Sequence, residues 1–361
     1  MILTICGGGN LGHVIAAFAA HRGYEVRLLT RHPERWSHDI TIDTPDGKLI
    51  TGHISRISNR PEDVIPQSDI ILLCLPGYAI ADCLRGIAPL LYPQMGGRPE
   101  SAATPPPLGG GWVGAIGSVV SSTGFFFEAL KILPPTTPLF GFQRVPFIAR
   151  VKEYGRSAHL LGYKPQLNMA VEHLQDAEPL RQQIEQLLDT PVELLGSHYE
   201  ASLTNSNPLL NTSRLFTLWH DWHEGMVYPT QSRFYADWTD EASQLLIDMD
   251  REFFRLLDVL PVRPGSIPTI LDYYESHDAA SLTRKLRSIP AFRDILSPMK
   301  RLPSFGEGQG DGPFIPDFQS RYFTEDFPYG LAIIRRLMQE HHIAAPYIEM
   351  VYQWGCSLGS F

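Results

Sequence analysis

Three glycines near the N-terminus have the spacing of a phosphate-binding turn. The segment GGGNLG at 7–12 satisfies the pattern G-x-G-x-x-G through Gly7, Gly9 and Gly12. The first glycine permits a tight turn, the second lets the backbone approach a pyrophosphate, and the third allows close packing of helix on strand. Free N–H groups at the start of the following helix then face the anion. The pattern predicts a dinucleotide site at the loop residues Gly7, Gly9, Asn10, Leu11 and Gly12.

The residues after the second expected strand distinguish between the nicotinamide dinucleotides. Folds that bind NAD usually place Asp or Glu about 20 residues beyond the glycine loop, where it binds the ribose 2′-hydroxyl. Here the position reads Thr30-Arg31, and Arg31 follows Gly12 by 19 residues. An arginine can pair with a 2′-phosphate and stack on adenine. We expect NADP(H) to be preferred, bound by Thr30 and Arg31, and NAD(H) stays open because a single arginine also occurs in solvated loops.

The elements around this loop alternate between short apolar runs and helical patterns. Residues 2–6 and 25–30 have the pattern of buried strands, and residues 11–21 between them have helical apolar spacing. A strand, a helix and a strand in this order form a right-handed unit with parallel strands. The alternation continues through the strand 69–75, and Pro76 follows at the edge where such folds bind ligands. Further elements are expected at 78–91, 113–120, 177–189 and 192–196, with a hairpin formed by 156–163 and 166–171.

The second half of the chain changes character. Strand-like runs become scarce, and residues 240–260, 278–296 and 329–342 have the amphipathic pattern of helices. The sequence therefore predicts a Rossmann-type doubly wound α/β domain at residues 1–196, followed by an all-α domain at residues 197–361.

Composition limits the classes of protein that this chain can form. Its 361 residues carry 30 Lys and Arg against 39 Asp and Glu, a net charge of −9, which argues against general binding to nucleic acid or anionic membranes. No apolar run approaches the roughly 18 residues that span a bilayer, and the first residues enter a strand rather than a targeting signal. The four cysteines have no paired spacing, so we expect a reducing compartment, the cytoplasm, and no metal site. Gly/Pro-rich surface loops are expected at 96–111 and 302–320.

A polar stretch opens the helical half. The segment LTNSNPLLNTSRLF (203–216) places Asn205 and Asn207 before Pro208. This arrangement suits a helix start or an Asx turn, and it also places amides where a substrate could be bound.

Two further stretches combine charged and apolar side chains. The segment SRYFTEDFPYG (320–330) carries Arg321 and Asp326 ahead of an expected helix, where a carboxylate also serves as an N-terminal cap. The segment FQRVPFIAR (142–150) places Arg144 beside an apolar turn.

At these stretches the sequence resembles the opine dehydrogenase family, which includes octopine, nopaline and carboxyethyl-amino-acid dehydrogenases. CGGGNLGHV resembles the family's cofactor loop, QRVPFIARV its inter-strand turn, and TNSNPLL the start of its helical domain. The stretches YYESHDAASLTRKLRSIPAFRDI and SRYFTEDFPYGLAIIRRLMQEHHIAAP resemble a further helical segment and the C-terminal signature. The resemblance covers nearly the whole chain.

The resemblance implies a two-domain, nicotinamide-dependent oxidoreductase. Such an enzyme condenses a 2-oxo acid with the amine of an amino acid and reduces the imine, with the substrates between the cofactor domain and the helical domain. This chemistry needs a proton donor, a hydride and anchors for the carboxylates. By the motif match, Asp326 orients the acid/base group and Arg321 clamps a carboxylate. We assign three more residues to substrate binding: Arg144, Asn205 and Asn207.

The family's acid/base histidine is replaced in this chain. The family pattern places it three residues after the proline of Asn-x-Asn-Pro, and here that position is Asn211. Asparagine can hydrogen-bond a carbonyl but cannot carry a proton at neutral pH. Catalysis is therefore impaired, or another group supplies the proton, or the substrate differs. His198 near the domain junction is the best substitute, whereas His220 and His223 suit a helix surface better than a metal site.

The sequence thus leaves three functions to be distinguished. The first is opine-type reductive condensation with NADPH, in which Asp326 and Arg321 handle substrate and Asn211 occupies the acid/base position. The second is a nicotinamide-cofactor-binding protein with little catalysis, which Asn211 motivates. The third is a simple 2-oxo acid reductase. In each case the expected partners are small molecules, not nucleic acid or membrane, and the helical domain offers a surface for a homodimer.

Overall fold

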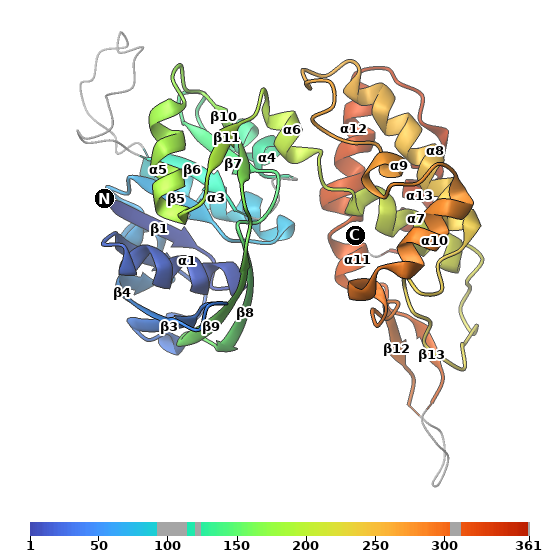
Figure 1. Ribbon diagram of the computed structural model, residues 1–361, viewed down its shortest axis with the longest axis horizontal. Coiled ribbons are helices and arrows are strands. Elements are labelled where there is room, and N and C mark those ends of the chain that lie inside the picture. The colour runs from blue at the N-terminus through green and yellow to red at the C-terminus, as the bar shows by residue number, and fades with distance from the viewer. Residues whose placement is uncertain (92–113, 120–123, 304–311, 360–361) are drawn as a thin grey trace. The chain divides into compact units, whose positions relative to one another are not determined.

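A computed structural model describes residues 1–91, 114–119, 124–303 and 312–359 and divides the chain into two compact units (Figure 1). The first unit is Met1–Thr204 and the second is Asn205–Phe361. The loop expected at 96–111, and the middle of the loop expected at 302–320, lie outside the described residues.

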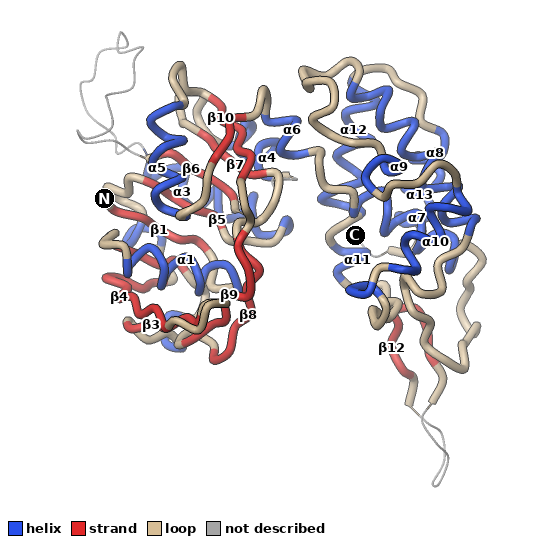
Figure 2. Tube along the Cα trace, in the orientation of Figure 1, coloured by secondary structure: helices blue, strands red, loops and turns tan. Residues whose placement is uncertain are grey.

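The described part of the first unit is built on one mixed, 11-stranded sheet (Figure 2). The order of the strands across the sheet is β11-β10-β7-β6-β5-β1-β2-β4-β3-β9-β8. Neighbouring strands from β7 to β4 are parallel, whereas β10 is antiparallel to β7, β3 to β4, and β8 to β9. The strands are β1 (Ile2–Cys6), β2 (Glu25–Leu29), β3 (Asp39–Asp43), β4 (Leu49–Ser58), β5 (Ile70–Leu73), β6 (Ala115–Ser118), β7 (Leu139–Phe142), β8 (Phe147–Glu153), β9 (Ser157–Tyr163), β10 (Leu167–Glu172) and β11 (Val192–Leu194).

Helices cover both faces of this sheet. Leu3 and Ile5 of β1 share a buried cluster with α1 and α5, whereas Cys6 of the same strand shares one with α3 and α4. Alternate residues of a strand point to opposite faces, so each buried strand packs helices on both sides. The helices are α1 (Asn10–His21), α2 (Pro61–Val64), α3 (Gly77–Leu91), α4 (Phe125–Ile132), α5 (Glu178–Leu188) and α6 (His198–Ser202). The predicted doubly wound, Rossmann-type domain is confirmed.

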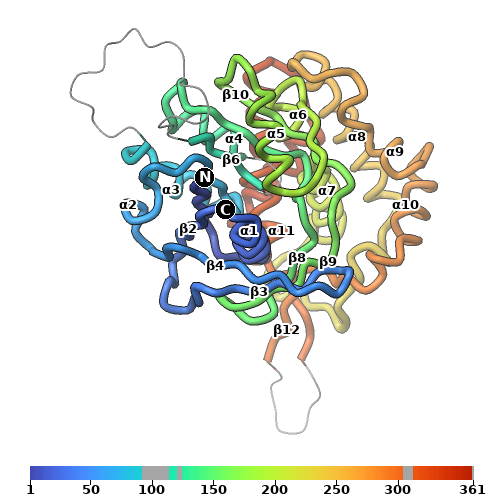
Figure 3. Tube along the Cα trace, turned by 60° about the vertical axis from the view of Figure 1, so that its left-hand side comes forward, coloured from blue at the N-terminus to red at the C-terminus, as the bar shows by residue number. Residues whose placement is uncertain are grey.

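Two antiparallel pairs extend the sheet beside α1 (Figure 3). Strands β3 and β4 were not predicted from the sequence, and the runs 156–163 and 166–171 were predicted to pair with each other. That pairing is wrong, because β9 pairs with β8 and β3, while β10 pairs with β7 and β11. The segment interpreted as a turn at 142–150 contains the start of β8, which supplies the antiparallel partner of β9.

The boundary between the units lies after Thr204 and not after residue 196. The short helix α6 packs on β7 and β10. Gln143, at the end of β7, donates from its Nε2 to the carbonyl oxygen of Glu200 at 3.0 Å. These contacts place residues 197–204 in the first unit.

The described part of the second unit is helical, apart from a short antiparallel pair of strands that was not expected. The segment expected as one helix at 329–342 begins with a π-helical turn, η3, before α12. None of the helices in the described ranges is both long and apolar enough to cross a membrane. The elements are α7 (Asn207–Trp219), α8 (Asp240–Leu257), α9 (Ile270–Tyr273), α10 (Ala279–Ser288), β12 (Met299–Arg301), β13 (Phe314–Pro316), α11 (Arg321–Thr324), η3 (Phe327–Leu331), α12 (Ala332–Glu340) and α13 (Pro346–Ser357).

Local sequence explains where these helices begin and end. The Thr239 side chain caps α8 by accepting a hydrogen bond from the Ala242 N–H at 3.2 Å. Asp278 and Ser281 form a reciprocal capping box at the start of α10, and Pro290 follows the end of that helix.

Candidate functional site

Of the three motif glycines, Gly7 and Gly12 lie in crowded surroundings and Gly9 faces open space. Gly7 has a φ of +114°, and a Cβ there would lie 2.6 Å from the carbonyl oxygen of Cys74. A Cβ on Gly12 would lie 2.0 Å from the carbonyl oxygen of Gly7, so only glycine lets the loop and the helix approach this closely. A Cβ on Gly9 would have no atom of the described residues within 4 Å. The open space therefore lies where an anion would approach the backbone.

The helix α1 begins at Asn10, directly after the loop, and its first N–H groups carry the positive end of the helix dipole. The Oδ1 of Asn10 accepts a hydrogen bond from the Val151 N–H of β8 at 2.8 Å. Leu11 packs, half-buried, against the core. These two side chains hold the loop in place, so any contact with a pyrophosphate would come from backbone N–H groups.

A buried histidine that the sequence analysis did not single out fixes the same loop. His13 Nε2 accepts a hydrogen bond from the Gly155 N–H at 2.7 Å, so the proton of this ring is on Nδ1, which donates to the Gly9 carbonyl at 2.8 Å. Burial lowers the pKa of His13, which keeps the ring neutral. In the sequence, His13 could have been recognised as a polar residue within the otherwise apolar pattern of this helix. His13 ties the glycine loop to the β8–β9 turn.

Two aromatic side chains lie against Gly8, the loop residue between Gly7 and Gly9. A Cβ on Gly8 would lie 2.8 Å from Trp36 Cζ2, 3.1 Å from Tyr154 Oη and 3.2 Å from Thr30 Oγ1. The Arg35 guanidinium lies over the Tyr154 ring at 4.4 Å from its centroid. The predicted residue Thr30 therefore faces the loop, together with two aromatic rings from distant parts of the sequence.

The remaining predicted cofactor residues lie at the carboxyl ends of strands that flank β1. Arg31 is exposed and follows β2, and Pro76 follows β5, where its carbonyl accepts from the Ala79 N–H at 3.0 Å. Ligands of doubly wound folds bind at this edge of the sheet. The tight glycines, the space over Gly9 and the N-terminus of α1 fit a dinucleotide.

The second unit brings two predicted residues into direct contact. Asn211 of α7 donates from its Nδ2 to Asp326 Oδ2 at 2.7 Å, although the residues are 115 positions apart. Asn211 is only 5% exposed, and Asp326 is half-buried. Burial raises the pKa of the Asp326 carboxyl from 3.8 to about 6, against the opposing effects of the Asn211 hydrogen bond and the Arg321 charge. This carboxyl therefore titrates close to neutral pH.

Packing of α7 against η3 makes this contact possible. A Cβ on Gly330 would lie 2.5 Å from Pro208 Cγ, so glycine is required where the two elements cross. The Leu331 N–H donates to the Asp326 carbonyl at 2.8 Å, which closes the π-helical turn directly after the carboxylate. Turns of this kind occur frequently at functional sites.

The other predicted substrate residues differ in their surroundings. Asn205 Oδ1 accepts from the Asn207 N–H at 3.1 Å, which is the Asx turn that opens α7. Arg321 is exposed at the start of α11, and its charge acts on the Asp326 carboxyl. Arg144 is exposed after β7 in the first unit.

The histidines considered as substitutes for the acid/base group have other partners. His198 Nδ1 lies 2.8 Å from Glu172 Oε1, and the ring packs against Phe126. Glu172 pairs with Leu139, the first residue of β7, so this histidine is set back from the carboxyl edge of the sheet. His220 and His223 lie on the surface of the second unit. In the described ranges, no group of three or more His, Cys, Asp or Glu is arranged to hold a metal ion.

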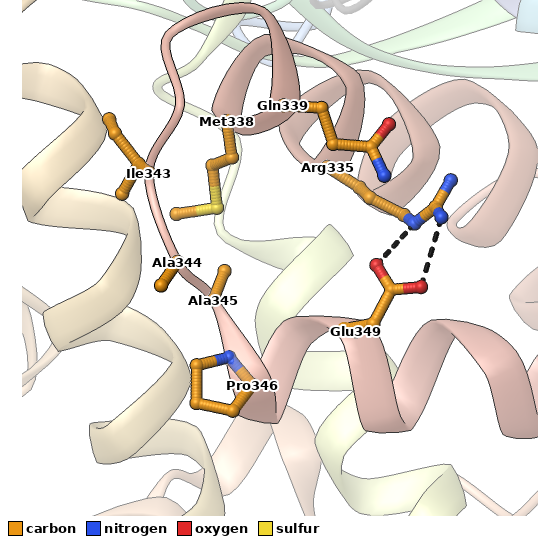
Figure 4. A pocket seen from close by; sticks show the side chains of 8 residues that line it. All are labelled: Arg335, Met338, Gln339, Ile343, Ala344, Ala345, Pro346 and Glu349. Carbon is orange, nitrogen blue, oxygen red and sulfur yellow. Dashed lines mark hydrogen bonds and ion pairs between the residues drawn. The ribbon is translucent and has the colours of Figure 1, made fainter.

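A cavity of about 300 Å³ lies away from these residues, between α12 and α13 (Figure 4). Its charged side chains neutralise each other, because Arg335 donates to Glu349 through Nε at 2.6 Å and Nη2 at 2.9 Å. The rest of its lining is mostly apolar, with Met338, Ile343 and Pro346. Residues predicted for substrate or cofactor do not line this cavity.

Comparisons with known proteins cover both units. Residues 194–358 match the family described as NAD/NADP octopine/nopaline dehydrogenase, alpha-helical domain. The chain is 28% identical to tauropine dehydrogenase of Arabella iricolor, over 99% of this chain and 91% of that protein, and 25% identical to octopine dehydrogenase of Pecten maximus, over 98% and 88%. A structure of octopine dehydrogenase with NADH and L-arginine superposes with a TM-score of 0.79 at 22% identity, covering 98% of this chain and 88% of that chain.

The doubly wound fold with its glycine loop, followed by a helical unit with a buried amide–carboxylate pair, fits a nicotinamide-dependent oxidoreductase with a separate helical domain. The match over the helical part and the relatives narrow the class further. Residues 194–358 are similar to the NAD/NADP octopine/nopaline dehydrogenase helical domain, and nearly the whole chain is similar to proteins named tauropine and octopine dehydrogenase.

Proposed function

We propose that this protein condenses a 2-oxo acid with the amine of an amino acid and reduces the resulting imine. The observation that carries the proposal is the hydrogen bond between Asn211 and Asp326, which joins two separated motifs of the family in one buried pair. The glycine loop, with its open space over Gly9, supports the use of a dinucleotide.

The residues of this chain have distinct roles in the proposed reaction. Arg321 binds a substrate carboxylate, for which the planar guanidinium is suited. Asp326 holds or releases a proton in the working pH range, because burial raises the pKa of its carboxyl to about 6. Arg144, Asn205 and Asn207 complete the proposed substrate contacts. The nicotinamide, when bound, supplies the hydride.

We propose NADP(H) as the preferred cofactor. Arg31 is exposed beside the buried Thr30, where its cationic side chain would meet a 2′-phosphate. Arg35 lies over Tyr154 next to the same loop and adds positive charge there. The position that binds a ribose 2′-hydroxyl in NAD enzymes is not acidic here.

Cofactor oxidation with separate substrates tests the proposed function. The protein should oxidise NADPH only when pyruvate and an amino acid are both present. Turnover with pyruvate alone would instead indicate a simple 2-oxo acid reductase. Binding of NADPH without turnover of any pair would indicate a cofactor-binding protein.

We propose the cytoplasm as the compartment. All four cysteines lie in the described residues and are free thiols, and Cys6 and Cys74 are buried beneath the cofactor loop. Free thiols persist in a reducing compartment.

A further inference from the structure

The buried carboxamide of Asn211 has one satisfied end and one unsatisfied end. Its Nδ2 donates to Asp326 Oδ2 at 2.7 Å. Its Oδ1 is buried, and no group of the described residues donates a hydrogen bond to it. Buried acceptors are normally paired, so this oxygen lacks a donor that a ligand can provide.

The orientation of the carboxamide follows from the chemistry of its partner. An ionised carboxylate only accepts hydrogen bonds, so the amide nitrogen of Asn211 must face Asp326. Reversal of the amide would place Oδ1 against a carboxylate oxygen. While Asp326 is ionised, Asn211 therefore presents a carbonyl oxygen, and not an N–H, on its other side.

The neighbouring hydroxyl groups on α7 are engaged elsewhere. Thr212 donates from Oγ1 to the Pro208 carbonyl, and Ser213 donates from Oγ to the Leu210 carbonyl at 3.1 Å. Both are local bonds along the helix. Neither hydroxyl donates to Asn211 Oδ1.

We propose that Asn211 Oδ1 accepts a hydrogen bond from the N–H of the amino substrate and thereby selects that substrate. This inference rests on the proposed function, because that function supplies the two substrate classes to be compared. A 2-oxo acid anion carries only acceptors on its ketone and carboxylate, which a carbonyl oxygen repels. An amine, an ammonium or an iminium carries N–H donors, so the amino acid is the substrate that matches this oxygen.

Protonation of Asp326 reverses the preference. A protonated carboxyl can donate to Asn211 Oδ1, and the amide then turns its N–H groups toward the substrate. Burial raises the pKa of this carboxyl to about 6, so affinity for the amine falls as the pH is lowered through that value. The charged and titratable groups around this carboxyl are Arg321 and Tyr322 of α11, Glu325 directly after α11, and Tyr235 from the segment between α7 and α8.

Binding of matched ligands to Asn211→Leu tests the inference. The probes are L-alanine with propionate and L-arginine with 5-guanidinopentanoate, because each pair differs only in the amine. Calorimetry on the protein saturated with its nicotinamide cofactor should show that Asn211→Leu weakens the amino member at least about tenfold, while the amine-free member changes less than about twofold. The control Thr217→Val removes a half-buried hydroxyl from the same helix and should change neither.

Equal weakening of both members of a pair would overturn the inference, and so would a wild-type protein that does not prefer the amino member of either pair. These are binding measurements, so they are independent of turnover. Wild-type turnover with a 2-oxo acid and an amino acid, but without selective loss in Asn211→Leu, would refute the inference and leave the proposed function intact. Selective amine binding without turnover would refute the function and leave the inference intact.

Asp326→Asn provides a second variant if the leucine substitution prevents folding. It keeps the size of the side chain and removes the titrating group. The amine affinity of the wild-type protein should fall between pH 7 and pH 5, and that of Asp326→Asn should not change over the same range. A pH dependence that persists in Asp326→Asn would contradict the proposed reversal of the amide.

Discussion

Asn211 and Asp326 form an amide–carboxylate pair at a position where the resemblance implies an imidazole–carboxylate pair. Both pairs can donate from nitrogen to the carboxylate and present a second polar atom to a substrate. They differ in proton transfer, because an amide does not exchange a proton at neutral pH. In the proposed reaction Asp326, whose carboxyl has its pKa raised by burial to about 6, is the proton donor that lies beside this amide.

Substituting histidine for Asn211 distinguishes the effect of this residue on substrate binding from its effect on proton transfer. In Asn211→His, Nδ1 can donate to Asp326 while Nε2 keeps an acceptor for the amine. We expect kcat to rise about 100-fold, the usual contribution of an acid/base group, with the KM for the amino acid within about threefold of wild type. Steady-state kinetics against each substrate measures both values. An unchanged kcat would mean that another group already transfers the proton efficiently.

The predicted preference for NADP(H) over NAD(H) depends on a single side chain, that of Arg31. Arg31→Ala should weaken NADPH binding about 10- to 100-fold, because a charged hydrogen-bond partner of the 2′-phosphate is lost. Affinity for NADH, which lacks this phosphate, should change less than about twofold. Fluorescence titration measures both. The matched control is Arg22→Ala. Arg22 follows the C-terminal end of α1, away from the glycine loop, and pairs with Asp189. Equal loss for both cofactors would refute the assignment of the 2′-phosphate to Arg31.

Packing between elements determines whether the pair can form. Gly330→Ala places a methyl group about 2.5 Å from the Pro208 ring, which cannot move away without displacing α7. We expect a loss of about 1–3 kcal/mol in unfolding free energy and a larger proportional loss in kcat/KM, because the Asn211–Asp326 hydrogen bond is stretched. Chemical denaturation and kinetics measure the two effects.

Gly86→Ala is the matched control for that substitution. A Cβ on Gly86 of α3 would lie 4.0 Å from Pro61 Cγ, which is an ordinary contact. Alanine should leave stability unchanged or slightly increased there, since Gly86 lies inside a helix. Equal effects of the two substitutions would show that the crossing at Gly330 tolerates a side chain.

The sequence predicted the elements whose patterns are local. Strands β1, β2 and β5 are short apolar runs bounded by turns, and helix α8 has a clear amphipathic period and a Thr239 cap. The pairing of β9 and β10 was wrong because both have similar patterns, and strand partners depend on the whole sheet. Similarly, the motif match placed Asn211 and Asp326 in one site, but the unsatisfied Asn211 Oδ1 depends on three-dimensional packing.

At the scale of the whole molecule, net charge does not determine which ligands bind. The chain has a net charge of −9, yet its proposed ligands are all anionic or zwitterionic. In the proposed function the attraction comes from local features: the N-terminus of α1 and Arg31 in the first unit, and Arg321 in the second.

The two units should respond in opposite ways when the pH falls from about 7.5 to 5. In the first unit, burial lowers the pKa of His13, so the unfolded chain binds the proton more readily and stability is lost as the pH falls. In the second unit, burial raises the pKa of both Asp250 and Asp326 from 3.8 to about 6. These two folded carboxyls bind protons more readily than the unfolded chain, so stability is gained between about pH 7 and pH 4.

Hydrogen exchange, followed separately in peptides from each unit, measures this divergence. Asp250 accepts a hydrogen bond from the Ile270 N–H at 3.0 Å, a role that the Oδ1 of an asparagine can take over. Asp250→Asn should therefore stabilise the second unit by about 1–2 kcal/mol at pH 7.5 and reduce its gain at pH 5. The first unit should respond as in the wild type. Parallel loss of stability in both units on acidification would contradict the opposite signs assigned to His13 and to the two carboxyls.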